Sequence, residues 1–302
     1  MSEQPGIAEL LLLDLLSAKR SVGLNELSGE LGLEGEEVLR LVEKLSRNYI
    51  IRLEGSRVSW SSGDNPRTFK PWGWMLQYRV VTGSTMAAAR HLNPWSIVVA
   101  EYQLSGRGRF GKSWVSSLGG LWVTYKLRVS PRAASISSLA IPLYVIESLE
   151  KVSNTTFNVK WPNDITYRGR KVSGVLLEAE SIGEDIVLYV GVGINVNNEP
   201  PLPTAESLKN ITGELVARNK VLSVLTSLIS RIEHYARRPE TIMHEYTSRL
   251  ETLGRRVEAE TDEGTIEGVV EDVDEQGRLV LKTDGGVVRL EPYRARNVRY
   301  VD

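Results

Sequence analysis

The sequence predicts an α+β protein in three parts: an N-terminal helical module with a small wing of strands, a central mixed α/β domain, and a small C-terminal β-barrel. Three observations predict this class. Apolar residues recur at helical spacing through the first 48 residues, strand and helix patterns mix over about residues 75–250, and short alternating strands follow Arg255. We therefore expect the three parts to span residues 1–62, 75–253 and 254–302.

The N-terminal part has the plan of a winged helix-turn-helix. Helical patterns cover residues 7–18, 23–33 and 34–48. Asn25 is the expected N-cap of the second helix. The third helix has one apolar face, formed by Val38, Leu41, Val42 and Leu45. Residues 49–60 suit two short strands around Gly55, which would form the wing, and residues 61–73 have the composition of a linker.

The central part is expected to contain strands on either side of a glycine-rich loop, followed by further strands and helices. Strand patterns cover residues 96–104, 120–129, 157–161, 171–180 and 186–196. Helical patterns cover residues 136–152, 222–238 and 239–250, with Pro239 in a first turn. Beyond Arg255, four strand patterns are separated by turn signals at residues 262–264, 276–277 and 284–286, which is typical of an SH3-like barrel.

Composition excludes several classes of chemistry. The 302 residues include no cysteine, which excludes disulfides, thiol nucleophiles and thiolate metal sites. His91, His234 and His244 are far apart and form no direct metal motif. The formal net charge of −1 gives no overall attraction to nucleic acid or membranes, so an anion site must be a local cluster. Acidic residues among the first leucines (Glu3, Glu9 and Asp14) argue against a signal peptide, and no apolar run reaches the ~18 residues of a membrane span, so we expect a cytoplasmic protein without membrane contact.

The segment GRGRFGKS, residues 106–113, fits both the phosphate loop of nucleotide hydrolases and the dinucleotide fingerprint. Both motifs need a helix directly after the loop, whereas Gly119 and Gly120 would break a helix and a strand pattern follows them. The dinucleotide motif also needs an acidic residue about 20 positions on, where Lys126 and Arg128 stand. The segment is therefore predicted to be a loop between two strands. Taken alone, it is either an anion-binding loop or a mobile basic hairpin.

Four motifs in one order resolve this choice. They are E-x-Q-x-x-G-R-G-R-x-G-x-x-W at residues 101–114, K-W-P-N-D at 160–164, R-K-x-x-G-x-L-x-E at 170–178 and G-x-G-I-N at 191–195. Together they resemble the biotin protein ligase family, and the catalytic resemblance covers about residues 75–250. It implies a central domain of the biotin/lipoate ligase type. The N-terminal winged helix is similar to the version of the family in which the ligase also represses a biotin operon.

The resemblance implies a two-step reaction with biotin and Mg-ATP as substrates and no tightly bound prosthetic group. Biotinyl-5′-AMP forms first, and biotin then passes to a lysine of a biotin carboxyl carrier protein. The reaction needs cations to offset the repulsion of two anions and a loop to exclude water, but no protein nucleophile. This suits a chain without cysteine. Operator DNA and a homodimer partner are further expectations.

The site residues carried over from the family fall into overlapping sets. Lys171 and Arg107 are the expected catalytic cations. The biotin-binding set is Ser84, Thr85, Met86, Gln103, Arg107, Gly108, Arg109, Lys171 and Gly174. The set for ATP and the adenylate is Arg107, Arg109, Trp114, Lys160, Asn163, Asp164, Lys171 and Asn195. Asp164 is also a candidate to orient magnesium brought by ATP or the incoming lysine.

Some of these residues have simpler alternative roles. Ser84 and Thr85 could cap a helix, Trp114 could be a core residue and Lys171 could be a solvated lysine in a basic turn. Met86 stands where the family usually has asparagine, which removes a polar contact from the ureido site.

The DNA-binding prediction rests on Arg40, Lys44 and Arg47 of the third helix. Residues 1–60 contain seven Lys or Arg and ten Asp or Glu, a net charge of −3. The third helix also opens with Glu34, Glu36 and Glu37, where base-reading residues usually lie. The module is therefore either an operator-binding element or a helical module that gates the active site or contacts a partner. For the whole chain, the alternatives are a lipoate ligase or transferase of the same fold and a non-catalytic, biotin-sensing DNA-binding regulator.

Overall fold

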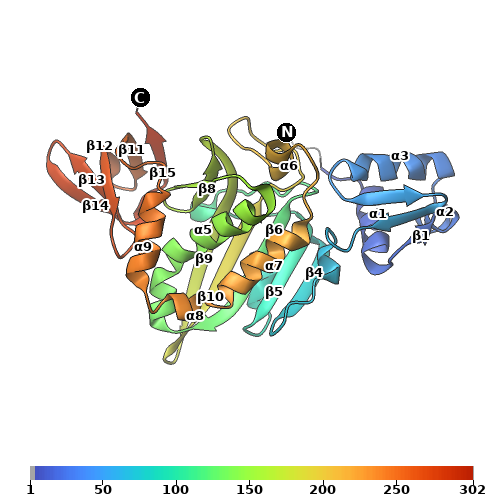
Figure 1. Cartoon of the computed structure of the whole chain (residues 1–302), viewed down its shortest axis with the longest axis horizontal. Coiled ribbons are helices and arrows are strands. Elements are labelled where there is room, and N and C mark those ends of the chain that lie inside the picture. The colour runs from blue at the N-terminus through green and yellow to red at the C-terminus, as the bar shows by residue number, and fades with distance from the viewer. Residues whose placement is uncertain (1–3, 302) are drawn as a thin grey trace.

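The computed structural model describes residues 4–301, so residues 1–3 and 302, including Glu3, lie outside the described part. Figure 1 shows the N-terminal module at one end of the long axis, the C-terminal strands at the other, and a large sheet between them. None of the helices in residues 4–301 is both long enough and apolar enough to cross a membrane. The mixed α/β centre and the separate C-terminal β part agree with the predicted fold class.

The N-terminal module contains the three expected helices, α1 (Ile7–Ala18), α2 (Leu24–Leu31) and α3 (Gly35–Ser46). The expected strand pair is β2 (Ile51–Glu54) and β3 (Arg57–Trp60), and a two-residue strand β1 (Val22–Gly23) joins it in the order β1-β3-β2. Asn25 is not the N-cap of α2, because the helix begins at Leu24 and Gly23 takes the cap position without a side-chain bond. A separate apolar core holds the module together, built around Leu12, Leu16, Leu27, Val38 and Val42.

Residues 61–73 are not an open linker. Asp64 is fully buried, and Asn65 caps the short 3₁₀ turn η1 (Pro66–Thr68) by accepting a hydrogen bond from the Arg67 amide. The Asn219 amide of the central domain donates to the Gly63 carbonyl at 2.9 Å. The composition of this segment predicted a turn-rich connection correctly, but the Asp64 carboxylate and the Asn65 carbonyl accept hydrogen bonds from residues more than 150 positions away.

The central sheet has seven strands in the order β4-β5-β6-β10-β9-β8-β7. All neighbours are antiparallel except β4 and β5. The five expected strands are β5 (Ser96–Gln103), β6 (Leu121–Val129), β7 (Asn158–Lys160), β9 (Arg170–Ile182) and β10 (Asp185–Ile194). Two further strands, β4 (Met75–Thr82) and β8 (Asp164–Tyr167), had no clear alternating pattern of their own. Every central strand except β4 contributes buried apolar residues to the main core, and β4 packs the partly buried Leu76 against it.

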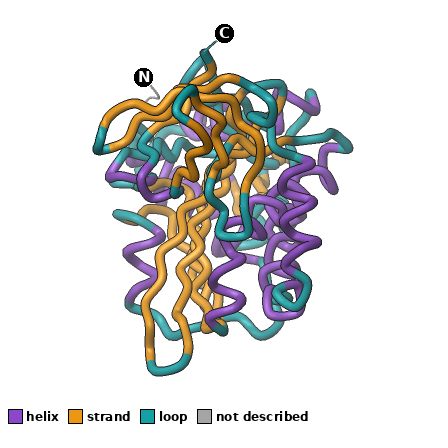
Figure 2. The backbone as a smooth tube through the Cα atoms, turned by 90° about the vertical axis from the view of Figure 1, so that its left-hand side faces the viewer, coloured by secondary structure: helices purple, strands orange, loops and turns teal. Residues whose placement is uncertain are grey.

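Helices cover both faces of this sheet, most of them on one side (Figure 2). The long helix α5 (Pro131–Ser153) packs against α7 (Arg218–Ile229), α8 (Ile232–Tyr235) and α9 (Pro239–Ser248). The helix α5 begins earlier than expected because Ser130 caps it and Pro131 occupies its first turn. The single helix expected at residues 222–238 is two helices, while Pro239 does stand in the first turn of α9. The short helices are α4 (Thr85–Arg90), which packs on β5, β6 and β10, and α6 (Leu208–Thr212).

The C-terminal part is a five-stranded antiparallel sheet in the order β14-β13-β12-β11-β15. The four expected strands are β11 (Arg256–Thr261), β12 (Gly264–Val273), β13 (Leu279–Thr283) and β14 (Gly286–Leu290). The fifth strand, β15 (Asn297–Tyr300), follows the 3₁₀ turn η3 (Pro292–Arg294). The apolar residues of this sheet join the core of the central domain, and the Trp161 indole donates to the Gly277 carbonyl at 2.9 Å. The C-terminal part is therefore docked firmly beside the K-W-P-N-D segment.

Candidate functional site

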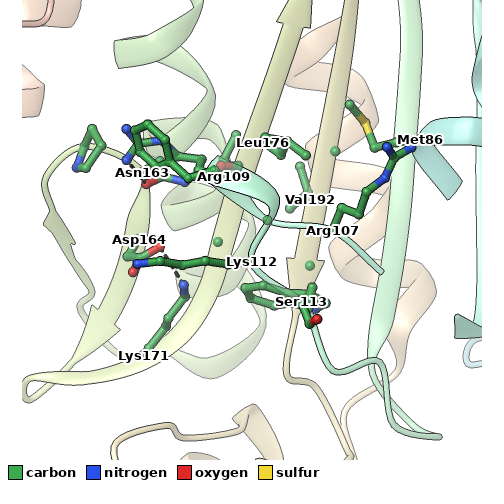
Figure 3. Close-up of a pocket in the computed structure, with 18 of the residues that line it drawn as sticks. Met86, Arg107, Arg109, Lys112, Ser113, Asn163, Asp164, Lys171, Leu176 and Val192 are labelled. Carbon is green, nitrogen blue, oxygen red and sulfur yellow. Dashed lines mark hydrogen bonds and ion pairs between the residues drawn. The ribbon is translucent and has the colours of Figure 1, made fainter. Parts of the chain in front are cut away.

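One cavity collects nearly all the residues predicted for the site. It lies between the β5–β6 loop, the paired strands β9 and β10, the turn between β7 and β8, and the segment before β15 (Figure 3). The predicted residues that line it are Ser84, Thr85, Met86, Gln103, Arg107, Gly108, Arg109, Trp114, Lys160, Asn163, Asp164, Lys171 and Gly174. Residues from four separate sequence motifs thus meet at one place.

The glycine-rich segment joins strand to strand, as predicted. β5 ends at Gln103 and β6 begins at Leu121, and only the 3₁₀ turn η2 (Arg109–Gly111) lies between them. The loop is folded back on itself, because the Trp114 amide donates to the Gly106 carbonyl at 2.9 Å and the Gly108 amide donates to the Lys112 carbonyl at 2.7 Å. Without a helix after it, the loop lacks the dipole and free amides that both familiar nucleotide motifs require.

The C-terminal part holds the tip of this loop. The Arg109 guanidinium donates to the carbonyls of Pro292 and Ala295, and Lys112 Nζ donates to the Arg296 carbonyl at 2.9 Å. Burial lowers the pKa of Arg109, although Asp164 opposes this effect. Since carbonyl oxygens are weaker partners than anions, these two cations are suited to bind an anion in place of the protein carbonyls.

Lys171 lies on the opposite wall, at the start of β9. Its Nζ is 2.7 Å from the Asp164 carboxylate and 4.9 Å from the centre of the Trp114 ring (Figure 3). Both charged side chains are about one third exposed, so the pair is reachable from the cavity. Lys171 differs from a purely solvated lysine in that its ammonium contacts a carboxylate and an aromatic face.

Asn163 and Lys160 flank this pair. The Asn163 amide donates to the Val175 carbonyl, and its oxygen accepts from Arg109 at 3.3 Å. Lys160 Nζ lies 5.2 Å from the centre of the Tyr300 ring of the C-terminal part. The turn between β7 and β8 therefore connects the basic loop with the C-terminal strands.

The other end of the cavity contains a relay of neutral polar groups. Gln103 Oε1 accepts from the amide and hydroxyl of Thr85, and Gln103 Nε2 donates to Ser116 Oγ at 2.7 Å. Ser84 precedes α4 but its hydroxyl does not cap the helix. This hydroxyl is buried, lines the cavity, and has no hydrogen-bond partner within residues 4–301. A buried hydroxyl left unpaired is costly, so Ser84 is arranged to bind a polar ligand group.

Met86 closes the same end with an apolar wall. It packs in a small cluster with Ala89, Val98 and Tyr189, and Gly191 leaves room for its sulfur. A Cβ at Gly191 would lie 2.8 Å from Met86 Sδ. This end of the cavity consequently offers one unpaired hydroxyl beside an apolar surface.

Trp114 lies flat on two glycines that pair across the sheet, Gly174 of β9 and Gly193 of β10. A Cβ added at Gly193 would be 2.5 Å from Trp114 Cε2, and one at Gly174 would be 2.8 Å from Cζ3. Side chains at either position are therefore excluded by the indole. Gly193 was not predicted as a site residue, although its place in G-x-G-I-N was a usable signal.

Asn195 is not among the residues that line the cavity, so its predicted contact with the nucleotide stays a prediction. It is buried just after β10, where its side-chain oxygen accepts from the Asn198 amide at 3.0 Å and its own amide donates to the Val172 carbonyl. These bonds shape the turn that leaves the sheet. Arg40, Lys44 and Arg47 also lie elsewhere, on α3, and each forms an ion pair with a glutamate: Glu36, Glu9 and Glu43 respectively.

Several lining residues were not among the predicted site residues, although some of them, such as Trp161, Pro162 and Leu176, stand in the quoted motifs. They are Phe110, Lys112, Ser113, Trp161, Pro162, Val175, Leu176, Val192 and the C-terminal residues Ala295, Arg296, Asn297 and Val298. The C-terminal ones reach the cavity through tertiary packing alone. No group of three or more His, Asp or Glu residues within positions 4–301 is arranged to hold a metal ion.

Comparison with known proteins identifies the family. The Biotin/lipoate A/B protein ligase family matches residues 81–197, and the Biotin protein ligase C terminal domain matches residues 252–293. The chain is 33% identical to a biotin–[acetyl-CoA-carboxylase] ligase of Mycobacterium tuberculosis, over 72% of this chain and 86% of that one. It is 31% identical to the bifunctional ligase/repressor BirA of Bacillus subtilis, over 72% of each chain.

Solved structures agree with this comparison. The biotin protein ligase of Aquifex aeolicus, solved in complex with biotin and ATP, superposes with a TM-score of 0.65 at 29% identity. The match covers 75% of this chain and 99% of that one. With four motifs gathered in one cavity and relatives above 30% identity over most of their length, the chain belongs to the biotin protein ligase family.

Proposed function

We propose that the protein is an ATP-dependent biotin protein ligase that forms biotinyl-5′-AMP and transfers biotin to a lysine of a biotin carboxyl carrier protein. One observation carries the proposal: the cations Arg107, Arg109 and Lys171 line the same cavity as the unpaired Ser84 hydroxyl. A cationic half suits two reacting anions, and a neutral half with an orphaned hydroxyl suits a polar uncharged ring.

Each step assigns a task to these residues. In the first, a biotin carboxylate oxygen attacks the α-phosphorus of Mg-ATP, and the bond to the bridging oxygen breaks to release pyrophosphate. Lys171 and Arg107 stabilise the charge on the carboxylate and α-phosphate, and Arg109 binds phosphate after leaving the Pro292 and Ala295 carbonyls. In the second, the acceptor lysine amine attacks the acyl carbon, the acyl–oxygen bond breaks and AMP leaves. Asp164 is placed to orient the amine or the magnesium of ATP.

The remaining cavity residues divide between the two substrates. Biotin lies against Ser84, Thr85, Met86, Gln103, Gly108 and Gly174, and the nucleotide lies against Trp114, Lys160 and Asn163. Trp114, which packs on Gly174 and Gly193, covers the adenylate. Asn195 shapes the turn after β10, and its contact with the nucleotide stays a prediction.

The domain roles follow the same proposal. Residues 1–62 form a winged helix-turn-helix, supported by three helices followed by a strand pair. Residues 75–253 form the catalytic domain of the biotin/lipoate ligase type. Residues 254–302 form an SH3-like barrel, supported by the order of its five strands, and contribute cavity residues as well as the contacts to the loop tip.

One incubation tests the activity. The purified protein with Mg-ATP, biotin and a biotinyl carrier domain is expected to label the carrier, detected with a biotin-binding reporter. Omitting ATP and replacing the acceptor lysine are the controls. Lipoate in place of biotin distinguishes a lipoate ligase of the same fold, and absence of any labelled carrier would favour the non-catalytic regulator.

Arg107→Ala is expected to release the adenylate early. Arg107 is exposed at the mouth of the cavity, where it pairs in register with Ser113. Without its guanidinium the loop loses an anion contact, so water reaches the mixed anhydride. The expected result is continued ATP consumption with little carrier labelling, measured as the ratio of AMP formed to carrier labelled. A ratio near one would contradict the assignment.

Gly193→Ala is expected to slow adenylate formation by on the order of 10- to 100-fold, because a 1 Å misplacement at a reacting site costs that much. The new methyl would lie 2.5 Å from the Trp114 ring, so the indole must move. Gly191→Ala is the matched control: its methyl meets the flexible end of Met86 and should mainly raise the KM for biotin. Equal kinetics for Gly193→Ala and the wild type would remove Trp114 from the site.

A second function, binding of operator DNA by a homodimer, is favoured by α3. Arg40 and Lys44 lie on this helix of the proposed winged helix-turn-helix, and Arg47 is its C-cap. The relatives named bifunctional ligase/repressor support the same function.

A further inference from the structure

Arg218 is the largest charged side chain that is fully buried in the described part of the chain. It opens α7 and donates to two carboxylates: Nε to Asp64 Oδ1 at 2.9 Å, and Nη1 to Glu101 Oε2 at 2.6 Å. Nη2 donates to the Asp64 carbonyl at 2.8 Å. All three side chains are completely shielded from solvent. No residue of this cluster lines the ligand cavity.

The cluster ties together the two roots of the glycine-rich loop. Glu101 lies on β5, two residues before the end of this strand, and Gly120 is the last residue before β6. Besides Glu101, Arg218 Nη1 also donates to the Gly120 carbonyl at 3.0 Å. A single guanidinium nitrogen therefore bridges the strand that enters the loop and the strand that leaves it.

The N-terminal module also contacts the two roots of the glycine-rich loop and the Arg218 cluster. Asp64 Oδ2 accepts from the Ile50 amide at 2.9 Å and from the Trp60 indole at 2.8 Å, so the wing strands orient the carboxylate that holds Arg218. The Gly119 amide donates to the Tyr49 hydroxyl at 3.0 Å. The Tyr49 and Trp60 rings also lie 4.9 and 5.6 Å from the guanidinium carbon.

Contacts along β5 connect this cluster to the residues of the ligand cavity. Glu101 and Gln103 project from the same face of β5, because side chains two apart share a face. Gln103 bonds both Thr85 of the cavity and Ser116 of the loop. Gly119 approaches the module so closely that a Cβ there would lie 2.8 Å from Asn48 Cβ. A displacement of the module must therefore move the loop root.

The energetics make the cluster rigid. Removing charges from water is expensive unless each is paired and hydrogen-bonded, so the three groups are held in one arrangement. Burial raises the pKa of Glu101, while Arg218 opposes this shift. Burial alone would lower the pKa of Arg218, but the Asp64 and Glu101 carboxylates raise it overall. The guanidinium thus stays charged and keeps its bonds.

We infer that Arg218 is a positioning residue that fixes both roots of the glycine-rich loop, and that Asp64 and Tyr49 make this position depend on the N-terminal module. The inference rests on the proposed function in one respect, because it assumes that the loop retains the adenylate. It assigns the coupling between the module and the loop to these three side chains.

Trypsin provides a test that needs no ligand, because the loop contains Arg107, Arg109 and Lys112. Tyr49→Phe removes the hydroxyl that accepts from Gly119 and also interacts with Glu101, and it should leave the fold intact, confirmed by thermal unfolding. Loss of one hydrogen bond is worth about a fivefold change in opening, so cleavage within the loop should be about fivefold faster. Fragments are identified by mass spectrometry.

Arg67→Ala is the matched control. Arg67 also links the segment after the module to α1, through Ser17 and Asp14, but does not touch the loop or its roots. Loop cleavage in this variant should equal that of the wild type. The inference is overturned if Tyr49→Phe shows no faster loop cleavage than the wild type, or if both variants accelerate it equally.

The second readout is retention of the intermediate in the full-length enzyme. Biotinyl-adenylate should dissociate about fivefold faster from Tyr49→Phe than from Arg67→Ala, and faster still from Arg218→Met, with Arg218→Lys partly restored because it keeps one charge. Unchanged dissociation from Tyr49→Phe would overturn the coupling. A protein that bound no adenylate at all would contradict the proposed function instead. The tryptic result would then decide whether Arg218 fixes the roots of the loop.

Discussion

Lys171→Ala is expected to slow formation of biotinyl-adenylate by roughly 10²–10³-fold, the usual loss when one preorganised charge contact is removed. Lys171 Nζ is held by Asp164 at 2.7 Å and by the face of Trp114, so it needs no reorganisation as charge develops on the carboxylate and α-phosphate. The fold should survive, because the side chain is one third exposed. Pyrophosphate release at saturating biotin and ATP measures the step.

Lys112→Ala serves as the matched control for this variant. It also removes a lysine from the cavity wall. Lys112, however, donates to the Arg296 carbonyl, whereas Lys171 contacts Asp164 and the Trp114 ring. We expect its effect on the rate to be no more than about tenfold, roughly one ordinary hydrogen bond. Near wild-type pyrophosphate release from Lys171→Ala would remove this residue from the mechanism, and equal losses in both variants would show that only the total positive charge matters.

Local sequence was sufficient to predict the form of the loop, whereas its ligand class was implied by the family resemblance. Gly119 and Gly120 exclude a helix after the loop, so the strand–loop–strand form could be inferred from backbone preferences. The motifs also placed Lys171 and Asp164 within a few residues of adjoining strands, and the structure brings their charges into contact. In both cases the controlling interactions lie within the motifs themselves.

Other features depend on residues far apart in the chain and could not be predicted. Arg109 was predicted to bind the substrates, but no sequence pattern showed that carbonyls more than 180 residues later bind it in the structure. Asp64 stands in a segment with the composition of a linker, and its partner Arg218 shows no pattern that distinguishes it from a surface arginine. Asn195 lies in a family motif, yet its hydrogen bonds go to the neighbouring turn. Pairing of this kind is a property of the packed domains.

Operator binding by the N-terminal module is expected to be strongly dependent on salt and on the adenylate. Residues 1–60 carry a net charge of −3, so phosphate contacts must come from the local cluster of Arg40, Lys44 and Arg47 on α3. Each contact contributes about 0.9 to the slope of log affinity against log salt, so a dimer using all three should show a slope of about five. Its affinity should fall on the order of 10³-fold between 50 and 200 mM salt.

The structure shows ion pairs that oppose binding to DNA and that the sequence did not reveal. Arg40 and Arg47 pair with Glu36 and Glu43 one turn earlier on the same helix, so binding to phosphate must exchange these partners. Glu36→Gln should therefore strengthen binding, whereas Arg40→Ala should weaken it and lower the slope by about two, one contact from each protomer. Lys282→Ala, a mostly exposed lysine of the C-terminal part, is the control and should change neither.

Biotinyl-adenylate should strengthen this binding if it favours the dimer, because a ligand shifts an equilibrium only toward the state that it binds better. The measurement is a mobility shift with the protein's own upstream DNA and with biotin-gene promoters, over a salt series, with and without adenylate. Deletion of residues 1–60 separates the two tasks of the module. Docking through Tyr49 and Asp64 predicts that the deletion weakens retention of the adenylate even without DNA. No specific shift under any condition, together with that weakened retention, would leave loop positioning as the function of the module and remove operator binding.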